Sequence, residues 1–338
     1  MNANQRIALD VMGGDSAPAC NLDGALLAAE HGLPPERILL VGDENAIRTG
    51  LEERGGNPGF DILGSTEVIG MEEKPGVALR AKPNSSIAVA TGAVKMGAAG
   101  AHVSMGNTGA VVGAATVGLK TLPGVRRPGI AVTLELTGEP VTILDMGANV
   151  VPKPEHLLQY GHMGSVLTRD VLQRGPDGAK DSTKGAPRVG LLNIGEEPSK
   201  GTDLLRAAHA LLTESPLNFI GNVEGGDIFK GVADVVVTDG FTGNVVLKLL
   251  EDFSGFMLKL VMGELKTHGA QWGPEALGNV RKRIDYSEYG GALLLGVNGI
   301  VVIGHGRSDA TAVSNAINLA QRALDADVNG HIVRGLEG

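Results

Sequence analysis

Two stretches of the chain share the pattern (Ser/Thr)-x-Gly-x-Thr-Gly: Ser104-Met105-Gly106-Asn107-Thr108-Gly109 and Thr238-Asp239-Gly240-Phe241-Thr242-Gly243. Each follows a short apolar run and precedes a segment with helical spacing of apolar residues. The pattern therefore predicts, at both places, a strand, a glycine turn and the start of a helix. Free backbone N–H groups and the positive dipole end of a helix attract anions. The two stretches thus indicate a protein that holds a phosphate group.

Strand-like runs alternate with helix-like segments along most of the chain. We expect strands at residues 7–11, 38–41, 101–104, 130–136, 141–145, 189–193, 218–220, 233–238 and 300–303. We expect helices at 21–31, 44–54, 85–99, 109–121, 154–174, 202–213, 243–266 and 308–326. This alternation predicts an α/β fold with a mainly parallel sheet covered on both faces. The pair 130–136 and 141–145 predicts a hairpin, so the sheet is expected to be mixed.

The composition excludes several classes of protein. Hydrophobic residues make up 43% of the chain, which indicates a globular protein. The net charge of −9 and an aromatic content of 3% argue against nucleic-acid binding. Cys20 is the only cysteine, so neither an internal disulfide nor a thiolate zinc site is expected. Because no long uncharged apolar run and no secretory leader are visible, we expect a cytoplasmic protein without a membrane span.

No clear linker divides the chain. We therefore expect one catalytic domain over residues 1–338, with residues 174–187 as the best loop. The two copies of the glycine pattern stand 134 residues apart. Two intertwined halves are therefore an alternative organisation.

Polar glycine turns follow six of the predicted strands, at residues 10–15, 104–109, 145–149, 193–195, 238–244 and 304–308. Ligands of open α/β sheets bind beyond the carboxyl ends of the strands. We therefore favour a shared polar site, while ordinary turns between elements remain the alternative. The chain has no P-loop, no dinucleotide fingerprint and no metal-binding pattern, so no cofactor and no metal are expected.

Lys200 lies just before the helix predicted at 202–213. A cation at a helix N-terminus opposes the helix dipole and is unfavourable by itself. The position makes sense if the lysine and the dipole converge on one anion. A solvated surface lysine is the alternative.

The predicted helix at 243–266 carries a broad apolar stripe, which includes Phe253, Phe256, Met257 and Leu260. Beyond it, Trp272 is the only tryptophan of the chain and lies near Arg281-Lys282-Arg283. An apolar stripe beside a basic cluster is typical of contact with a membrane surface or a partner. Packing in the core or at a dimer interface explains the stripe equally well.

Taken in order, five motifs resemble the PlsX family of bacterial phosphate acyltransferases. They run from residue 7 to residue 291: Ile7-Ala8-Leu9-Asp10-Val11-Met12-Gly13-Gly14-Asp15, Gly106-Asn107-Thr108-Gly109-Ala110, Leu144-Asp145-Met146-Gly147-Ala148-Asn149, Asp239-Gly240-Phe241-Thr242-Gly243-Asn244 and Asp285-Tyr286-Ser287-Glu288-Tyr289-Gly290-Gly291. No single motif is decisive, but their order along nearly the whole chain is highly specific.

The resemblance implies a three-layer α/β/α sandwich, similar to isopropylmalate dehydrogenases and phosphate acetyltransferases, that forms a homodimer. It implies transfer of a fatty acyl group from acyl carrier protein to inorganic phosphate, which gives acyl phosphate for phospholipid synthesis without a cofactor or metal. It further implies peripheral association with the inner face of the cell membrane through an amphipathic helical hairpin at 243–283, with Phe253, Phe256, Met257, Leu260 and Trp272 in contact with the anionic surface.

The resemblance also implies that Lys200 and Asn244 are catalytic. We expect Lys200 and the helix starts near Thr108 and Thr242 to bind phosphate, and the Asn244 amide to donate to an oxyanion. The full set of predicted phosphate- and substrate-binding residues is Asp10, Gly13, Gly14, Asn107, Thr108, Gly109, Gly195, Thr242 and Gly243.

Two other classes of function remain open on the sequence. The fold kinship allows an oxidoreductase that acts on a hydroxy acid, although the expected Arg and Asp clusters and metal site are missing. A non-enzymatic anion-binding or membrane scaffold is the third possibility. The docking patch for acyl carrier protein is also open between Arg281-Lys282-Arg283 and Arg126-Arg127.

Overall fold

In the computed structural model of the chain, residues 6–135, 139–172, 185–267 and 290–337 are described. The chain forms two compact units. Unit 1 combines both ends of the chain, Met1–Pro128 and Tyr289–Gly338, and unit 2 is the segment Gly129–Glu288 between them. The expectation of a single catalytic domain over residues 1–338 stays a prediction.

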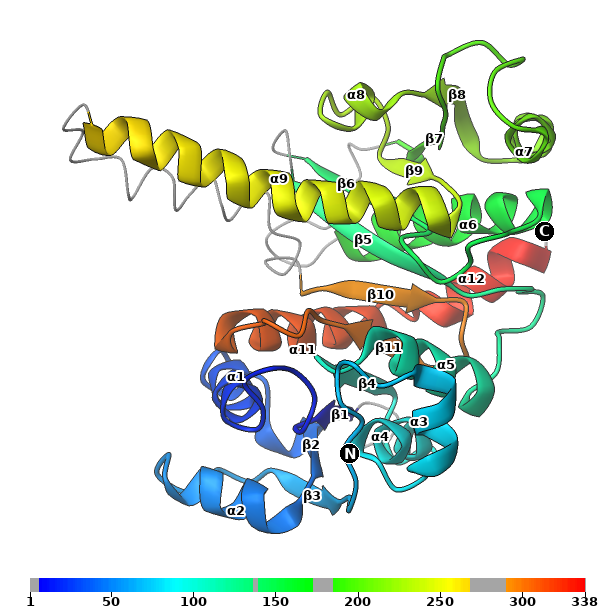
Figure 1. The fold of residues 1–338 in the computed structure, drawn as a ribbon. Helices are drawn as coiled ribbons and strands as arrows, with labels where there is room; N and C mark the ends of the chain where they lie inside the picture. Colours follow the sequence, from blue (N-terminus) through cyan, green and yellow to red (C-terminus); the bar gives the residue numbers. More distant parts are fainter. Residues whose placement is uncertain (1–5, 136–138, 173–184, 268–289, 338) are drawn as a thin grey trace. The chain divides into compact units, whose positions relative to one another are not determined.

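The strands of unit 1 lie in the order β3-β2-β1-β4-β11-β10 (Figure 1). Their bounds are β1 (Ile7–Asp10), β2 (Ile38–Gly42), β3 (Asp61–Gly64), β4 (Ala101–Ser104), β10 (Ala292–Leu295) and β11 (Ile300–Ile303). Neighbouring strands are parallel except for β10, which is antiparallel to β11. Ser104 is in register with both Asp10 and Ile303. The carboxyl ends of β1, β4 and β11 therefore meet at one edge.

Helices cover both faces of the unit 1 strands. Figure 1 shows α1 and α11 together on one side and α3, α4 and α5 on the other. The helices of unit 1 are α1 (Ala19–Glu30), α2 (Glu44–Glu52), α3 (Pro75–Ala81), α4 (Ser86–Lys95), α5 (Thr108–Gly118), α11 (Ala310–Asp325) and α12 (Val328–Glu337), with a 3₁₀ turn η2 (Pro35–Arg37). The apolar side chains between these layers, among them Ile7, Leu40 and Val103, are fully buried.

The strands of unit 2 lie in the order β5-β6-β9-β7-β8. Their bounds are β5 (Gly129–Glu135), β6 (Pro140–Leu144), β7 (Arg188–Leu192), β8 (Asn218–Val223) and β9 (Val235–Val237). β5 and β6 form an antiparallel hairpin, and the other pairs are parallel. Val237 is in register with Leu144 and with Leu191. The carboxyl ends of β6, β9 and β7 therefore lie side by side.

The helices of unit 2 are α6 (Pro154–Leu167), α7 (Asp203–Glu214), α8 (Gly225–Ile228) and α9 (Gly240–Thr267), with a π-helical turn η3 (Thr168–Leu172). α6 packs on β6, β7, β9 and α7, whereas α9 contacts β6. In Figure 1 the carboxyl-terminal half of α9 (yellow) runs past the strands of unit 2. Among the described helices, none combines the length and the apolar character that a bilayer crossing needs.

The structure confirms the α/β architecture, the mixed and mainly parallel strands, and the hairpin. The sequence prediction missed two strands, β3 and β10, three α-helices, α3, α8 and α12, and the 3₁₀ turn η2. These elements are short or amphipathic, and β3 is largely exposed, so it lacks the apolar run that marked the central strands. The loop expected at 174–187 falls largely outside the described residues, and so does the second half of the hairpin expected at 243–283.

Candidate active site

Asp145 organises the loop that follows β6 in unit 2. Its buried carboxylate accepts hydrogen bonds from the backbone N–H groups of Ile130 (3.0 Å), Gly147 (3.0 Å), Ala148 (2.9 Å) and Asn149 (2.7 Å). Burial raises the pKa of Asp145, although these four hydrogen bonds favour the charged form. The Asp145 side chain therefore fixes the loop backbone, and its buried carboxylate has no contact with solvent.

Helix α9 begins directly on this loop. A Cβ on Gly243 would lie 2.0 Å from the backbone oxygen of Asp145, and a Cβ on Gly240 would lie 2.6 Å from the backbone oxygen of Asn149. Only glycine permits such close approach of two backbones. The helix start is capped by Asp239, whose carboxylate accepts from the Thr242 backbone N–H (2.9 Å) and from the Thr242 hydroxyl (2.7 Å).

Asn244 lies in the first turns of α9, over the Asp145 loop. A Cβ on Gly147, which has a φ of 135°, would lie 3.4 Å from Oδ1 of Asn244. The side chain of Asn244 is exposed and forms no hydrogen bond with any residue that the structure describes. Its amide is therefore available to a ligand at the carboxyl edge of β6 and β9.

Lys200 lies in the loop between β7 and α7, two residues before the N-cap Thr202. This placement confirms the prediction that Lys200 immediately precedes a helix. A Cβ on Gly195 would lie 3.0 Å from Cγ of Lys200, so the lysine stem rests on that glycine. The side chain is exposed and has no ion-pair partner among the described residues. Because β7 and β9 are parallel neighbours, Lys200 and Asn244 belong to the same sheet edge.

The equivalent edge of unit 1 is centred on Asp10. Its carboxylate accepts from the hydroxyl of Ser104 (2.7 Å) and the backbone N–H of Met12 (3.1 Å). The buried carboxyl has a raised pKa because burial outweighs these hydrogen bonds. A Cβ on Gly13 would lie 2.6 Å from the Asp10 carboxylate, and Gly14 has a φ of 100°. Gly13 therefore packs directly on the Asp10 carboxylate, and Gly14 next to it adopts a backbone conformation that favours glycine.

Asn107 uses its whole side-chain amide on the protein. Its Oδ1 caps α5 by accepting from the Ala110 backbone N–H (3.0 Å). Its Nδ2 lies 3.0–3.2 Å from the carbonyl oxygens of Gly70, Met71 and Glu73. Any contribution of Asn107 to a ligand site therefore acts through the position of α5. The exposed residues of that helix start are Thr108 and Gly109.

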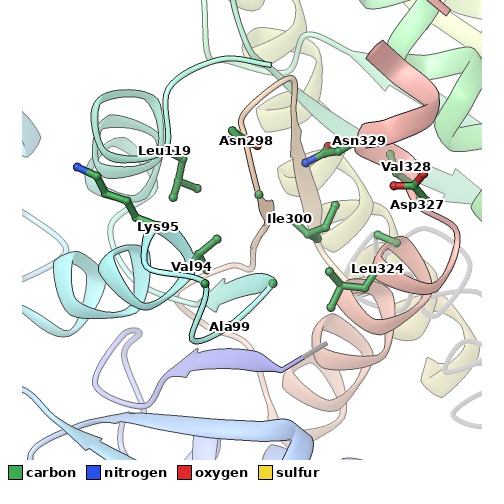
Figure 2. Close-up of a pocket in the computed structure, with 14 residues that line it drawn as sticks. Val94, Lys95, Ala99, Leu119, Asn298, Ile300, Leu324, Asp327, Val328 and Asn329 are labelled. Atoms are coloured by element: carbon green, nitrogen blue, oxygen red, sulfur yellow. The ribbon is translucent and has the colours of Figure 1, made fainter. Parts of the chain in front are cut away.

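A cavity in unit 1 lies at the opposite edge of its strands, away from the Asp10 turn. It measures about 390 Å³ and lies beside the amino-terminal ends of β4 and β11, where Figure 2 shows Val94, Leu119, Ile300 and Leu324 around it. None of the predicted site residues lines it. Within the described ranges, no group of three or more His, Cys, Asp or Glu side chains is placed to hold a metal ion.

Cys20, His305 and Arg307 lie near the carboxyl edge of the unit 1 strands, where β11 ends. The Cys20 thiol donates to the Ser308 carbonyl oxygen (3.1 Å), and burial, with Asp309 and Asp23 nearby, raises the pKa of the thiol. A raised thiol pKa reduces the thiolate fraction, so Cys20 is a poor nucleophile. The His305 ring accepts a hydrogen bond from the Arg307 backbone N–H (3.2 Å). This contact, between residues two positions apart, is local to the turn.

Comparison with protein families gives one match that spans almost the whole chain. The model of a family described as "Fatty acid synthesis protein" matches residues 5–331. The chain belongs to this family.

Curated relatives of the family carry a functional name. A protein of Heliobacterium modesticaldum named phosphate acyltransferase is 46% identical and aligns over 98% of both chains. One of Endomicrobium trichonymphae with the same name is 46% identical over 92% of this chain and 91% of its own. The family is thus the PlsX family of phosphate acyltransferases that the five motifs resemble. The chain is accordingly an acyltransferase, which excludes the oxidoreductase and scaffold alternatives.

Solved structures support the predicted fold. A phosphotransacetylase from Streptococcus pyogenes superimposes with a TM-score of 0.61, 18% identity and coverage of 96% of this chain and 95% of its own. The EutD phosphotransacetylase from Staphylococcus aureus gives a TM-score of 0.58 at 15% identity over 96% and 95%. These likenesses confirm an α/β fold of the phosphate acetyltransferase type.

Sequence reasoning missed the residues that support the site. Asp145, Asp239 and Ser104 hold the loops beneath the predicted ligand-binding residues. A local signal existed for Asp239, because an acidic residue three positions before Thr242 is a typical N-cap arrangement. Asp145 gave no such signal, since its partners include Ile130 on another strand.

Proposed function

We propose that this protein transfers a long-chain fatty acyl group from acyl carrier protein to inorganic phosphate. The product is an acyl phosphate that serves phosphatidic acid and phospholipid synthesis. Family membership supports the acyl transfer, and the names of the relatives support phosphate as the acceptor. The single observation that carries the proposal is the edge of β6, β9 and β7. There one cationic and one amide side chain, Lys200 and Asn244, are exposed and form no hydrogen bond or ion pair with the residues that the structure describes.

Lys200 and the N-termini of the neighbouring helices bind the phosphate in this proposal. Phosphate is a dianion or monoanion at neutral pH, so a lysine ammonium stabilises it by charge. Helix α7 begins three residues after Lys200, at Asp203, and its N-terminus adds free backbone N–H groups and a positive dipole end. The start of α9, with Thr242 and Gly243, lies after the neighbouring strand. Gly195 leaves the room in which the Lys200 stem lies.

The chemical step needs no enzyme nucleophile, because phosphate oxygen is itself nucleophilic. It attacks the thioester carbonyl carbon, and a C–O bond forms while the carbonyl oxygen becomes an oxyanion. The Asn244 amide donates a hydrogen bond to that oxyanion. Collapse of the tetrahedral intermediate breaks the C–S bond, and the electron pair leaves with sulfur as a thiolate. A thiol pKa near ~8.5 makes this leaving group stable enough to need little acid assistance.

In unit 1, we propose that the exposed start of α5 binds substrate. Thr108 and Gly109 present the first turn of the helix, and Asn107 fixes its position by the cap. Asp10, Gly13 and Gly14 hold the adjoining turn in a shape that larger residues would disrupt. The roles of Asn107, Asp10, Gly13 and Gly14 in binding are therefore indirect and act through the backbone.

The proposed reaction is tested by thiol release from palmitoyl-acyl carrier protein, with and without inorganic phosphate and without lipid. We expect release that depends on phosphate, with acyl phosphate trapped by hydroxylamine as the hydroxamate. Release at the same rate without phosphate, or no release with any acyl chain length, would contradict the proposal.

We further propose that the protein is a cytoplasmic homodimer that binds the anionic inner face of the membrane through the hairpin at 243–283. The supporting observation is that Phe253, Phe256, Met257 and Leu260 are exposed on α9. Trp272 and the basic residues 281–283 lie outside the described residues, while Arg126 and Arg127, the other candidate docking patch for acyl carrier protein, are exposed.

Membrane binding is tested with Phe253→Glu and Leu260→Glu. A carboxylate on the apolar face opposes insertion between anionic headgroups, so both variants should fail to sediment with phosphatidylglycerol vesicles. Turnover without lipid should be largely retained. If either variant loses the dimer by light scattering, the stripe serves subunit packing instead of lipid contact.

A further inference from the structure

Apolar side chains are unusually exposed around Lys200 and Asn244. Val151 is 89% exposed and Val150 58%, in the loop after β6; Ile194 is 80% exposed, after β7. Phe241 (61%) and Val245 (53%) flank the predicted binding residues in the first turns of α9. We call these five side chains the apolar rim. They come from three adjacent strand ends of unit 2, those of β6, β9 and β7, and the last two lead to Asn244 and Lys200.

The apolar rim continues along α9 without a break. Phe241, Val245, Leu249 and Phe253 follow one another at intervals of four residues, which places them on one helix face. All four side chains are more than half exposed. Lys248, which precedes Leu249, pairs with Glu251 at 2.8 Å. A row of exposed apolar side chains, which we call the track, therefore begins beside Asn244 and runs along the helix axis.

The acyl chain is covalently bonded to the thioester carbonyl, so its first carbons must lie at the start of this track. In the proposed reaction the thioester carbonyl lies at Asn244, so the first methylenes of the acyl chain lie within bonding distance of that point. A hydrocarbon chain beside a water-exposed site gains about 0.8 kcal/mol for each methylene group that it buries. The surface that meets the chain is therefore expected to be apolar, uncharged and continuous with the catalytic residues, as the rim is.

We propose that the apolar rim and the α9 face as far as Leu249 bind the acyl chain of the substrate, and that Leu249 contributes to the preference for long chains. This inference rests on the proposed acyl transfer. Leu249 lies about 6 Å along the helix from Val245, because each residue adds ~1.5 Å. Short acyl chains end before Leu249, whereas long ones reach it.

The test compares Leu249→Gln and Val151→Ser with the unchanged protein, in the absence of lipid. Phosphate-dependent thiol release is measured with palmitoyl- and butyryl-acyl carrier protein. We expect the ratio of kcat/KM for palmitoyl over butyryl to fall about tenfold in Leu249→Gln, mainly through KM, which is the loss of roughly two buried methylene groups. Val151→Ser lies outside α9, so a fall in its ratio does not depend on any role of that helix in assembly.

Two control variants separate this proposal from its rivals. Val117→Ser removes an equally exposed valine of α5 in unit 1 and should leave the ratio unchanged. Leu260→Gln alters α9 about 22 Å from Val245 and should also leave the ratio unchanged. An equal fall in all α9 variants, or an equal loss for both chain lengths, overturns the acyl track. If the unchanged protein releases no thiol with either substrate, the proposed reaction itself fails.

Discussion

The two copies of the (Ser/Thr)-x-Gly-x-Thr-Gly pattern have the same residue types but begin their helices at different positions. In the first copy, residues 104–109, Asn107 is the N-cap and the helix begins at Thr108. In the second copy, residues 238–243, Asp239 is the cap and the helix begins at Gly240. The helix start is thus two residues earlier in the second copy.

This offset changes what the polar side chains can do. In the first copy the polar side chains hydrogen-bond within the protein. Asn107 donates to three carbonyl oxygens, and Ser104 donates to Asp10. In the second copy the Asp239 carboxylate forms the cap. Asn244, the residue directly after this copy, is exposed and forms no hydrogen bond with the described residues. Equal sequence patterns therefore support different roles, and the reactive amide is expected directly after the second copy, at Asn244.

The largest expected effect is on catalysis, at the strand ends of unit 2 that surround the second copy. Lys200→Ala or Asn244→Ala should lower phosphate-dependent turnover by ~10²–10³, the usual effect of losing one group that stabilises the transition state. Circular dichroism and thermal unfolding should be unchanged, because both side chains are exposed. Retention of more than about half of the turnover would refute these assignments.

The final glycines of the two copies should differ in their tolerance of a methyl group. In Gly243→Ala the new Cβ would lie 2.0 Å from the Asp145 backbone oxygen, whereas in Gly109→Ala it would lie 2.5 Å from the Pro75 ring of the short helix α3. Backbone cannot yield locally, so we expect Gly243→Ala to cost ~3 kcal/mol or more and Gly109→Ala ~1 kcal/mol. Urea unfolding of both variants measures this difference, and equal costs would contradict it.

The strands that precede the two copies should differ in how their contribution to the free energy of unfolding depends on pH. His102 of β4 is fully buried, with Thr91 Oγ1 3.2 Å from Nδ1, and burial lowers its pKa from 6.5 to about 4. The matching position before the second copy is Val236. Because the unfolded chain binds the proton more tightly, this histidine's contribution to stability is complete above pH 6.5 and is lost as the pH falls towards 4.

At pH 5 the loss amounts to about 2 kcal/mol relative to neutral pH. The variant His102→Val should unfold with a correspondingly weaker pH dependence between pH 5 and pH 7.5. Subtracting its urea unfolding curves from those of the unchanged protein isolates the histidine, since Asp10 and Asp145 titrate in both. Parallel pH profiles for the two proteins would exclude this role for His102.

The smallest difference concerns the caps. Asn107→Asp keeps the cap oxygen but turns a carboxylate oxygen towards three carbonyl oxygens, and we expect a cost of ~2 kcal/mol. Asp239→Asn keeps the cap oxygen and places an amide beside the Thr242 hydroxyl, which can accept as well as donate, so the cost should be below ~1 kcal/mol. Thermal unfolding compares the two variants; equal costs would show that the caps are interchangeable, and the reverse order would contradict the prediction.

Much of the architecture followed from local signals in the sequence. Glycine turns after apolar runs located the strand ends that carry Asp10, Ser104, Asp145 and Thr238, and the hairpin of β5 and β6 followed from two apolar runs joined by a turn. β10 was missed although Gly291 and Gly296 bound its four apolar residues, because such a short run carries no period.

The site was less accessible to sequence reasoning than the fold. The catalytic assignments of Lys200 and Asn244 came from the family resemblance, because a lysine before a helix and an asparagine inside one are common on protein surfaces. The offset between the two copies depends on which polar residue captures the first free backbone N–H, and both Asn107 and Asp239 are good caps. Close packing of Gly243 against Asp145 decided the outcome in unit 2, and such a contact between distant segments leaves no local pattern.

The order in which the ribosome delivers the chain bears on how unit 1 forms. β11, which pairs with β4 and β10, belongs to the last forty residues of the sequence, and so does α11, which packs on α1. Unit 2 receives all of its strands earlier, because they lie between Gly129 and Val237. During synthesis the inserted unit can therefore complete its sheet while the half that begins the chain still lacks a central strand. Until β11 has been made, β4 can therefore pair with β1 on one side but lacks its neighbour on the other.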